Sequence, residues 1–481
     1  MDRTLPAPEF DPELIARYDG NGPRYTSYPT SPHFQRDFDG KALRSVIRAS
    51  NEDLIPSPLS LYIHIPFCAS PCFYCGCRRV ITRDIGKADL YLERLYREIE
   101  LISALFDRDR LVQQLHFGGG TPNFLDLPRM RDLMESLAGH FGFAHPRERE
   151  FGIEIDPRYA DGDYVRGLAE LGFDRLSIGV QDFDPAVQRA VNRVQGVAET
   201  RDLLEAGRAA GFTSINIDLI YGLPRQTLAG FERTLADVVA LSPDRFERTL
   251  ADVVALSPDR IAVYGYAHLP GLFKAQQQID VTELPDPATR LALFGRALTL
   301  LDKAGYVYIG MDHFARAGDE LVLAQRNGTL QRNFQGYSTH GYCDIVGLGM
   351  SAISRIGDSY SQNAKDLVGY YASLDAGRLP VACGLSLDED DLIRRELIGQ
   401  LMCHGELDTG DFGRRHRLIF DEYFEAEMQK LRRLAEDGLV ALEPSSIRVT
   451  PRGRLLLRTI AMCFDAYLDR DLPSPRYSRT I

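Results

Sequence analysis

The chain has 481 residues, of which 44% are hydrophobic and 26% are charged, and its formal net charge is −12. This length accommodates a large catalytic domain and one or two smaller domains. The negative charge argues against general nucleic-acid binding, which depends on neutralising phosphates. No apolar run approaches the roughly 20 residues that cross a bilayer, so we expect no membrane span.

The first residues predict an arm that precedes the catalytic region. The run Gly22-Pro23-Arg24-Tyr25-Thr26-Ser27-Tyr28-Pro29-Thr30 contains too many prolines for a long helix. The N-terminus has no apolar segment of signal-peptide length, so we expect the chain to stay in a reducing compartment, the cytoplasm. We predict an arm over residues 1–57, a catalytic domain over 58–379 and a C-terminal domain over 380–481.

From residue 61 onward, short β-rich runs alternate with longer helical patterns, which is typical of a parallel sheet with helical crossovers. One helical pattern covers residues 88–106, with Leu90, Tyr91, Ile99 and Ile102 as its apolar stripe. The predicted strands cover residues 61–65, 113–117, 151–155, 175–180, 215–219 and 261–266. Six βα units are fewer than the eight of a closed barrel. The sequence therefore predicts an α/β fold with an open, incomplete (β/α)6 barrel.

Three cysteines follow the first predicted strand, in the run Cys68-Ala69-Ser70-Pro71-Cys72-Phe73-Tyr74-Cys75, and no further cysteine or histidine follows at a zinc-finger spacing. A closed structural zinc site and a fully ligated cubane cluster both take four protein ligands. Three ligands therefore indicate a metal centre with one open position. A [4Fe–4S] cluster whose open iron binds S-adenosylmethionine (AdoMet) suits this pattern best. The alternative is a zinc site or a set of buried thiols.

Polar or glycine-rich residues stand where each predicted strand ends. After the cysteine loop of the first strand, they are Gly118-Gly119-Gly120-Thr121-Pro122, then Glu154 and Asp156, then Gln181, then Asp218, and finally Ala267 and His268. In barrel enzymes the carboxyl ends of the strands carry the active site. We therefore expect these residues to converge; the alternative is that each one caps a loop.

The triglycine run lacks the lysine of a phosphate-binding P-loop and the spacing of a dinucleotide fingerprint. Glycines allow a backbone to approach a ligand closely, so we expect this run to bind the amino-acid end of AdoMet. Glu154 could hold an ammonium group or a ribose hydroxyl, Asp218 a ribose, and Arg193 a carboxylate. For each, a structural ion pair is the alternative. Tyr62 and His64 alternate with apolar residues and should share one strand face.

Residues 231–245 read FERTLADVVALSPDR, and residues 246–260 repeat those letters without a change. Solenoid units are longer and recur at least three times, so we interpret the repeat as a recent duplication or a sequence-assembly error. Pro243 and Pro258 should each end a helix. We expect only one copy to dock on the barrel.

Beyond residue 380 the sequence predicts charged helices over residues 388–402 and 421–436, a hairpin over 438–449 and a helix starting near Pro451. This order is typical of a winged-helix module. In so acidic a chain we interpret it as a lid or dock and not as a DNA reader.

The cysteine spacing, with Tyr74 before the third cysteine, resembles the signature of the radical AdoMet enzymes. The chain further resembles the oxygen-independent coproporphyrinogen III oxidases, also called coproporphyrinogen dehydrogenases. The motifs that carry this second resemblance are PRYTSYPT, HIPFC with CxxxCxxCxC ending at Cys77, GGGTP, IEIDPR, GVQDF, NIDLIYGLP, YAHLP, GMDHFA and RNFQGY. The nearest alternative is a haem chaperone that shares the cluster motif. Such relatives typically lack the arm and carry phenylalanine in place of Cys77.

The resemblance implies oxidative decarboxylation of the ring A and B propionates of coproporphyrinogen III, giving the vinyl groups of protoporphyrinogen IX in haem biosynthesis. A 5′-deoxyadenosyl radical takes a β-hydrogen from each propionate, and loss of CO2 and one electron completes the double bond. The implied cofactors are one [4Fe–4S] cluster and two AdoMet. A one-electron donor such as flavodoxin or ferredoxin and a monomeric state are further expectations.

The resemblance also implies roles for residues at matched positions. Cys68, Cys72 and Cys75 are the implied cluster ligands, and Cys77 matches a cysteine that does not ligate the cluster. Contacts to the AdoMet on the cluster are implied for Tyr62, Gly119, Glu154 and Ile353. Contacts to the second AdoMet are implied for Tyr74, Gly120, Thr121, Gln181, Arg193, Asp218 and Ala267. The duplication lies just before Ala267.

Overall fold

The computed structural model describes residues 5–240, 257–468, 477 and 479. The chain divides into two compact units. The large unit comprises residues 34–293 and 342–386, and the small unit draws on residues 1–33, 294–341 and 387–481. The predicted arm is thus shared between the units, with residues 5–33 in the small one and 34–57 in the large one.

A parallel sheet forms the centre of the large unit. Its strands lie side by side in the order β13, β1, β4, β5, β6, β7, β8, and every neighbouring pair is parallel. All six predicted strands are confirmed, as β1 (Leu59–Ile65), β4 (Val112–Gly119), β5 (Glu150–Ile155), β6 (Arg175–Gln181), β7 (Ser214–Tyr221) and β8 (Arg260–Gly265). From β1 to β8 their order in the sheet follows the chain, as expected of successive βα units.

Strands of this sheet are rich in buried aliphatic and aromatic residues, because helices cover one face and side chains fill the other. In β1 the side chains of Leu61 and Ile63 are fully buried, as are Leu115 and Phe117 in β4. Beyond β13 (Asp344–Leu348) the sheet continues through three antiparallel strands. These are β14 (Ile353–Ile356), β15 (Ser359–Asn363) and β16 (Val381–Ser386).

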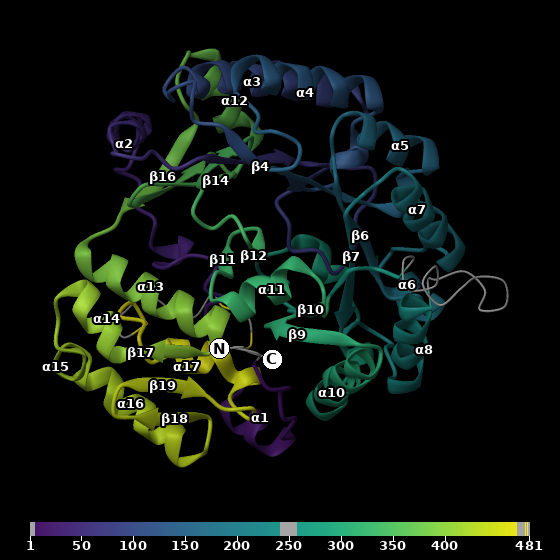
Figure 1. The fold of residues 1–481 in the computed structure, drawn as a ribbon. Helices are drawn as coiled ribbons and strands as arrows, with labels where there is room; N and C mark the ends of the chain where they lie inside the picture. The colour runs from purple at the N-terminus through teal and green to yellow at the C-terminus, as the bar shows by residue number, and fades with distance from the viewer. Residues whose placement is uncertain (1–4, 241–256, 469–476, 478, 480–481) are drawn as a thin grey trace. The chain divides into compact units, whose positions relative to one another are not determined.

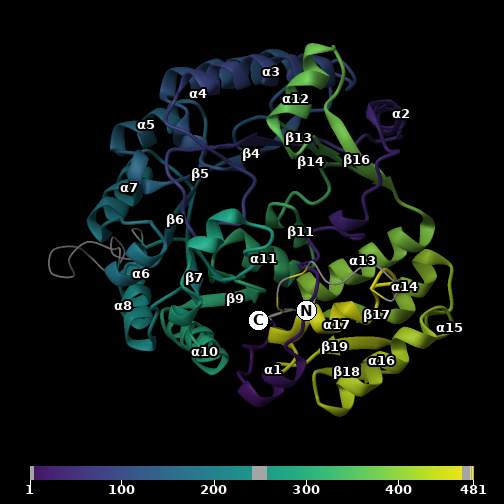
Figure 2. The ribbon, with the colours of Figure 1, turned by 180° about the vertical axis from the view of Figure 1, so that it is seen from behind.

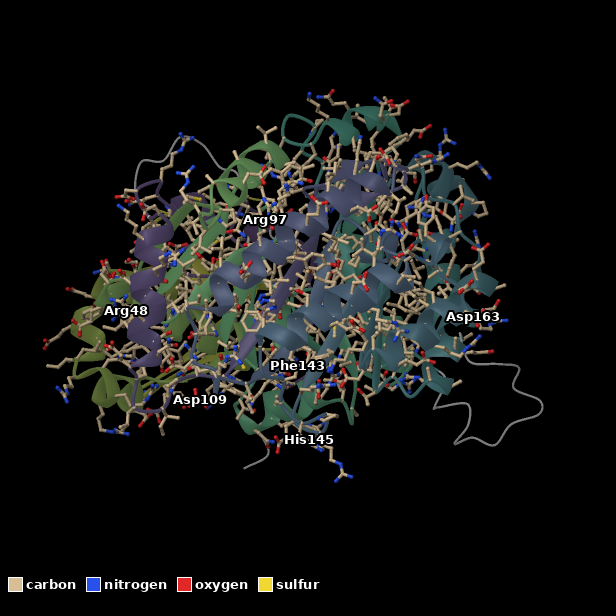
Figure 3. The ribbon with its side chains drawn as sticks, turned by 90° about the horizontal axis from the view of Figure 1, so that it is seen from above. Arg48, Arg97, Asp109, Phe143, His145 and Asp163 are labelled. Carbon is tan, nitrogen blue, oxygen red and sulfur yellow. The ribbon has the colours of Figure 1, made fainter. Side chains whose placement is uncertain are left out.

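Helices follow the outer side of the parallel strands, as Figures 1 and 2 show from opposite sides. They are α3 (Gly86–Ser103), α4 (Leu127–His140), α5 (Gly162–Glu170), α6 (Pro185–Ala190), α7 (Val197–Ala209) and α8 (Leu228–Val239). Further helices of this unit are α2 (Gly40–Asn51) and α12 (Leu367–Asp375), with short 3-10 turns η2 (Pro122–Phe124), η3 (Pro157–Tyr159), η4 (Lys274–Gln278) and η5 (Val281–Glu283). Charged side chains such as Arg97 and Asp163 lie on the outside of these helices (Figure 3).

The predicted helix over residues 88–106 is confirmed as α3, but its apolar stripe is partly wrong. Tyr91, Leu95, Ile99 and Ile102 are buried, whereas Leu90 is 50% exposed. Successive helical residues are about 100° apart, so Leu90 cannot share the face of Tyr91. From Tyr91 to Ile102 the four buried residues lie four, four and three positions apart, which is the spacing of one helix face.

The first copy of the tandem repeat contributes to helix α8. Residues 231–239 of the first copy form most of this helix, and the side chains of Phe231, Leu235 and Val238 are fully buried. The first copy therefore provides the docked helix. The rest of the second copy, residues 246–256, lies outside the described residues, and residues 257–260 lead into β8. Pro243 and the predicted end of the first helix also fall outside them.

The small unit combines hairpins with a C-terminal module. Its first two stretches contain α1 (Pro12–Tyr18), η1 (Ser31–His33), β9 (Tyr306–Gly310), β10 (His313–Arg316), α11 (Glu320–Asn327), β11 (Gln331–Asn333) and β12 (Gly336–Ser338). Helix α10 (Pro287–Lys303) leads into the second stretch. The C-terminal stretch contains α13 (Glu389–His404), β17 (Glu406–Asp408), α14 (Thr409–His416), α15 (Phe420–Tyr423), α16 (Glu425–Glu436), β18 (Val440–Glu443), β19 (Ser446–Val449), η6 (Arg454–Leu456) and α17 (Leu457–Met462).

The winged-helix outline is confirmed, with differences from the prediction in three places. The helix predicted to start near Pro451 begins only at Leu457, after the 3-10 turn η6. The helix predicted over residues 421–436 is interrupted at Phe424, whose ring is fully buried in the core of the unit. A short strand, β17, and the helix α14 were not predicted; β17 pairs with β19 to complete a three-stranded sheet.

Within the small unit, the proline-rich arm packs against α17 and the residues that follow it. The Arg458 guanidinium donates hydrogen bonds to the backbone carbonyls of Gly22 and Pro23. The Tyr25 hydroxyl donates to Asp465 at 2.9 Å. These contacts give the arm a fixed path without regular structure. Among the described helices, none is long and apolar enough to span a membrane.

Candidate active site

The cysteines occupy the loop that follows β1. Strand β2 (Phe67–Cys68) pairs in parallel with β3 (Val80–Ile81), and this pairing ties the two ends of the loop together. Cys68 and Cys72 are buried, Cys75 is partly exposed and Cys77 is exposed. The loop therefore holds two buried thiols, one partly exposed thiol and one exposed thiol at the carboxyl end of a central strand.

Each of the three predicted ligand sulfurs accepts hydrogen bonds. The Thr121 hydroxyl donates to Cys68 Sγ at 3.3 Å, and the backbone amide of Cys77 donates to Cys75 Sγ at 3.3 Å. Cys72 Sγ faces two guanidinium groups, Arg158 at 3.4 Å and Arg193 at 3.5 Å. Hydrogen bonds and positive charge at sulfur stabilise thiolates and tune iron–sulfur clusters. These residues thus fit a thiolate-ligated cluster.

The three thiols differ in electrostatic environment. Hydrogen bonds from Cys77 lower the pKa of Cys75 to about 6, whereas burial raises the pKa of Cys68 to about 11 despite the bond from Thr121. In the described part of the chain, no three Cys, His, Asp or Glu side chains gather around a point where one metal ion would sit. A cubane cluster requires a different spacing, since each of its thiolates ligates a different iron.

Asp156 organises the charges beside Cys72. Its carboxylate accepts hydrogen bonds from Arg193 at 2.8 Å and from Arg158 at 2.6 Å. Arg193 also donates to the carbonyl of Gly179 at 2.6 Å. The carboxylate was expected at this strand end, but Arg158 was not predicted as a site residue. Its position directly after Asp156 and Pro157, in a turn at a strand end, was the available signal.

The triglycine turn lies where no side chain fits. A Cβ on Gly119, whose φ is +116°, would come within 2.7 Å of the His64 ring, and one on Gly120 would come within 2.8 Å of the Phe67 carbonyl oxygen. A Cβ on Gly118 would meet Glu154 and Tyr62 at 3.1 Å. The glycines therefore let this turn approach the cysteine loop, besides leaving backbone groups available to a ligand.

The predicted face of β1 is confirmed. The Tyr62 hydroxyl and His64 Nδ1 are 3.3 Å apart, and His64 Nε2 bonds to the Arg78 carbonyl at 3.2 Å. His64 is thus a satisfied polar residue beside the sheet. Sequence reasoning missed His116, which stacks on Tyr62 and reaches Glu154 at 3.3 Å. Its alternation with Gly118 on β4 was the only signal for it.

Asp218 lies on β7 between two partners, the Ser177 hydroxyl at 3.0 Å and the Asn216 amide at 2.9 Å. Burial, with the nearby charge of Glu154, raises the pKa of Asp218 to about 6. In the sheet register Asp218 is opposite Gly179 of β6, two residues before Gln181. Gln181 itself has a φ of +71°. Gln181 is the last residue of β6, whereas Asp218 lies inside β7, so the two predicted residues stand on neighbouring strands.

Two predicted residues far apart in the sequence meet through Gln276. Its side-chain amide donates to the Tyr74 carbonyl at 2.9 Å and to the Ala267 carbonyl at 3.1 Å. Ile353 begins β14 next to β13, where a Cβ on Gly347 would lie 2.5 Å from the Ile353 carbonyl oxygen. Gly347 is in turn the register partner of Tyr62. Ile353 and Tyr62 thus both lie beside Gly347 of β13.

Comparisons with known proteins agree with this arrangement. The profile of the Radical SAM superfamily matches residues 62–238, and that of the HemN C-terminal domain matches residues 387–456. A solved structure of coproporphyrinogen III oxidase from Escherichia coli, described as a radical SAM enzyme, superposes with a TM-score of 0.88 at 44% identity. The superposition covers 96% of this chain and all of that one.

The fold and the cysteine site define a radical AdoMet enzyme, with a [4Fe–4S] cluster and AdoMet as its cofactors. Relatives named oxygen-independent coproporphyrinogen III oxidase match nearly the whole chain. The Pseudomonas aeruginosa protein is 50% identical over 98% of this chain and 99% of its own length. The Escherichia coli protein is 45% identical over 98% and 99%. This chain belongs to the oxygen-independent coproporphyrinogen III oxidase family.

Proposed function

We propose that this chain oxidatively decarboxylates coproporphyrinogen III to protoporphyrinogen IX without oxygen, as a step of haem biosynthesis. The ring A and B propionates each lose one hydrogen atom, one CO2 and one electron and become vinyl groups, and each electron passes to a separate one-electron acceptor. With cluster and AdoMet bound, the site supplies the adenosyl radical that takes the hydrogen. The protein's residues hold these groups in place.

One observation carries the proposal: three thiols, each accepting a hydrogen bond, lie at the carboxyl edge of a (β/α)6 sheet beside a glycine turn. We propose Cys68, Cys72 and Cys75 as the cluster ligands, since their sulfurs have the donors that thiolates need. The proposed contacts to the AdoMet on the cluster are Tyr62, Gly119, Glu154 and Ile353. Glu154 supports this because its side chain is 47% exposed and can accept from an ammonium group.

Iron content and product formation in matched cysteine variants test this proposal. Cys72→Ser should lose the cluster and all protoporphyrinogen formation in an anaerobic assay with reconstituted protein. Cys77→Ser is the matched control from the same loop: it should keep its iron and its cluster spectrum, yet turn over more slowly. If Cys72→Ser kept full iron, the ligand assignment would be wrong. AdoMet cleavage without vinyl formation in the unsubstituted protein would contradict the proposed reaction.

We further propose a second AdoMet, contacted by Tyr74, Gly120, Thr121, Gln181, Arg193, Asp218 and Ala267. The support is that Gln276 joins the segments of Tyr74 and Ala267, while Asp218 and Gln181 lie on the neighbouring strands β7 and β6. Arg193 and Thr121 already contact cysteine sulfurs, so they would serve both the cluster and this ligand.

Equilibrium binding of AdoMet tests the second site. The reconstituted protein should bind two AdoMet per cluster, and Asp218→Ala should bind one while keeping its iron. An unchanged stoichiometry in Asp218→Ala would contradict the role of this carboxylate. A one-electron donor such as flavodoxin or ferredoxin, a monomeric state and a cytoplasmic location complete the proposal.

A further inference from the structure

Two guanidinium groups, that of the buried Arg193 and that of the mostly buried Arg158, lie against the sulfur of Cys72. Arg158 Nη2 is 3.4 Å and Arg193 Nη1 is 3.5 Å from that sulfur, and their side chains are 12% and 7% exposed. Family resemblance gives Arg193 to an AdoMet and leaves Arg158 without a role. Burying a guanidinium is costly unless it is paired, so the position of Arg158 needs a physical explanation.

A short turn fixes the orientation of Arg158. Asp156 caps the 3-10 turn η3, and its carboxylate accepts from Arg158 Nε at 2.9 Å and from Nη2 at 2.6 Å. This two-point pairing sets the plane of the guanidinium. The group also lies over the Tyr159 ring, 5.3 Å from its centroid. The guanidinium therefore has one well-defined direction, toward the cysteine loop.

The same turn contacts the cysteine loop at a second point. Arg158 Nη1 donates to Ser70 Oγ at 3.4 Å, and the Tyr159 hydroxyl donates to the same oxygen at 3.1 Å. The turn thus contacts the loop on both sides of Pro71. This double contact fixes the distance between the Arg158 charge and the Cys72 sulfur.

We infer that Arg158 is a positioning residue that raises the reduction potential of the cluster through Cys72, an inference that rests on the proposed ligation by this cysteine. Arg158, Arg193 and Asp156 together carry one net positive charge. One-electron reduction adds one negative charge to the cluster, and nearby positive charge favours it. The attraction is only partly screened, because Asp156 and Arg193 are buried and the Arg158 side chain is 12% exposed. Hydrogen bonds to cluster sulfurs act in the same direction.

Redox titration of the full reconstituted chain, without AdoMet, tests this inference. A one-electron reductant supplies the electron, and the signal of the reduced cluster is followed by electron paramagnetic resonance. Arg158→Gln should lower the equilibrium constant for reduction about tenfold, which is 59 mV for one electron. Asp156→Asn removes a negative charge from the same network, so it should shift the potential upward.

A matched control is Arg97→Gln, which removes a positive charge from the exposed side of α3 (Figure 3). Its potential should equal that of the unsubstituted protein, because exposed charges are screened. Unchanged potentials, or shifts in the same direction, for Arg158→Gln and Asp156→Asn would overturn the inference. If Arg158→Gln cannot hold the cluster, the potential of Asp156→Asn tests the inference by itself. An unchanged or lower reduction potential in Asp156→Asn would refute the inference. A wrong ligand assignment would be recognised by a different measurement, because Cys72→Ser would then retain its iron.

Discussion

Glu98 of α3 is a fully buried carboxyl group that ties several segments of the large unit together. It accepts hydrogen bonds from the Gly349 amide at 2.8 Å, the Asn363 side chain at 2.6 Å and the Tyr370 hydroxyl at 2.5 Å. Gly349 begins the turn between β13 and β14, and Ile353 is the first residue after this turn. A helix residue 251 positions before Gly349 in the sequence thus anchors the segment that carries a proposed AdoMet contact.

We predict that Glu98 makes stability depend on pH. Burial raises the pKa of Glu98 from 4.5 to about 7, so between these values the folded protein keeps a proton that the unfolded chain has released. Its contribution to stability is then complete below about pH 4.5 and is lost as the pH rises through 7. The unfolding free energy of the unsubstituted protein, relative to that of Glu98→Gln, should fall by ~1–3 kcal/mol over this window.

Chemical denaturation at a series of pH values measures this difference. Glu100→Gln is the control, because Glu100 is exposed on the same helix; its stability should follow the unsubstituted protein at every pH. If Glu98→Gln and the unsubstituted protein showed the same pH dependence, the proton would not reside on this carboxyl group.

At the scale of the element, the tandem repeat lies between α8 and β8, and both elements use residues from it. The first copy forms α8, while the last residues of the second copy lead into β8. Asp259 accepts from Arg208 at 2.7 Å and from the Ile215 amide at 2.7 Å. The entry to β8 therefore uses an acidic residue of the second copy, Asp259.

Deleting residues 246–260 should leave fold and activity intact or improved. The deletion joins Arg245 directly to Ile261. Because the copies are identical, Asp244 then takes the position that Asp259 now has. The contacts to Arg208 and Ile215 can then form again, and the shorter connection should save on the order of 1 kcal/mol of loop-closure free energy. Melting temperature and AdoMet cleavage measure the outcome. Unfolding of the deletion protein, or loss of its activity, would make the second copy an integral element.

At the scale of the whole molecule, the parallel sheet could be predicted because its strands are short, apolar and each followed by polar residues. The ligand cysteines could be found because they lie within one short loop. His116 and Arg158 were missed because their contacts join different strands and loops: Arg158 and Cys72 are separated by 86 positions. Local pattern contains no information about which distant loop a side chain will reach.

The other incorrect predictions arise from tertiary packing, which the helix propensity of single residues does not include. Residues 421–436 are helix-forming throughout, yet burying the Phe424 ring in the core requires a break at that residue. Leu90 is apolar by type but lies on the outer face of α3. In both cases tertiary contacts override the local preference, which is why element boundaries and faces are harder to predict than element type.

The contacts between the arm and the last helix constrain the order in which the chain can fold during synthesis. Domains generally fold as units, with N-terminal ones first as the chain emerges from the ribosome. Here Gly22, Pro23 and Tyr25 find their partners at Arg458 and Asp465, more than four hundred positions later. Most of the large unit can therefore form while the arm still waits for its partners. A ribosome stalled before Arg458 should hold a chain whose arm is cleaved by protease far faster than its sheet.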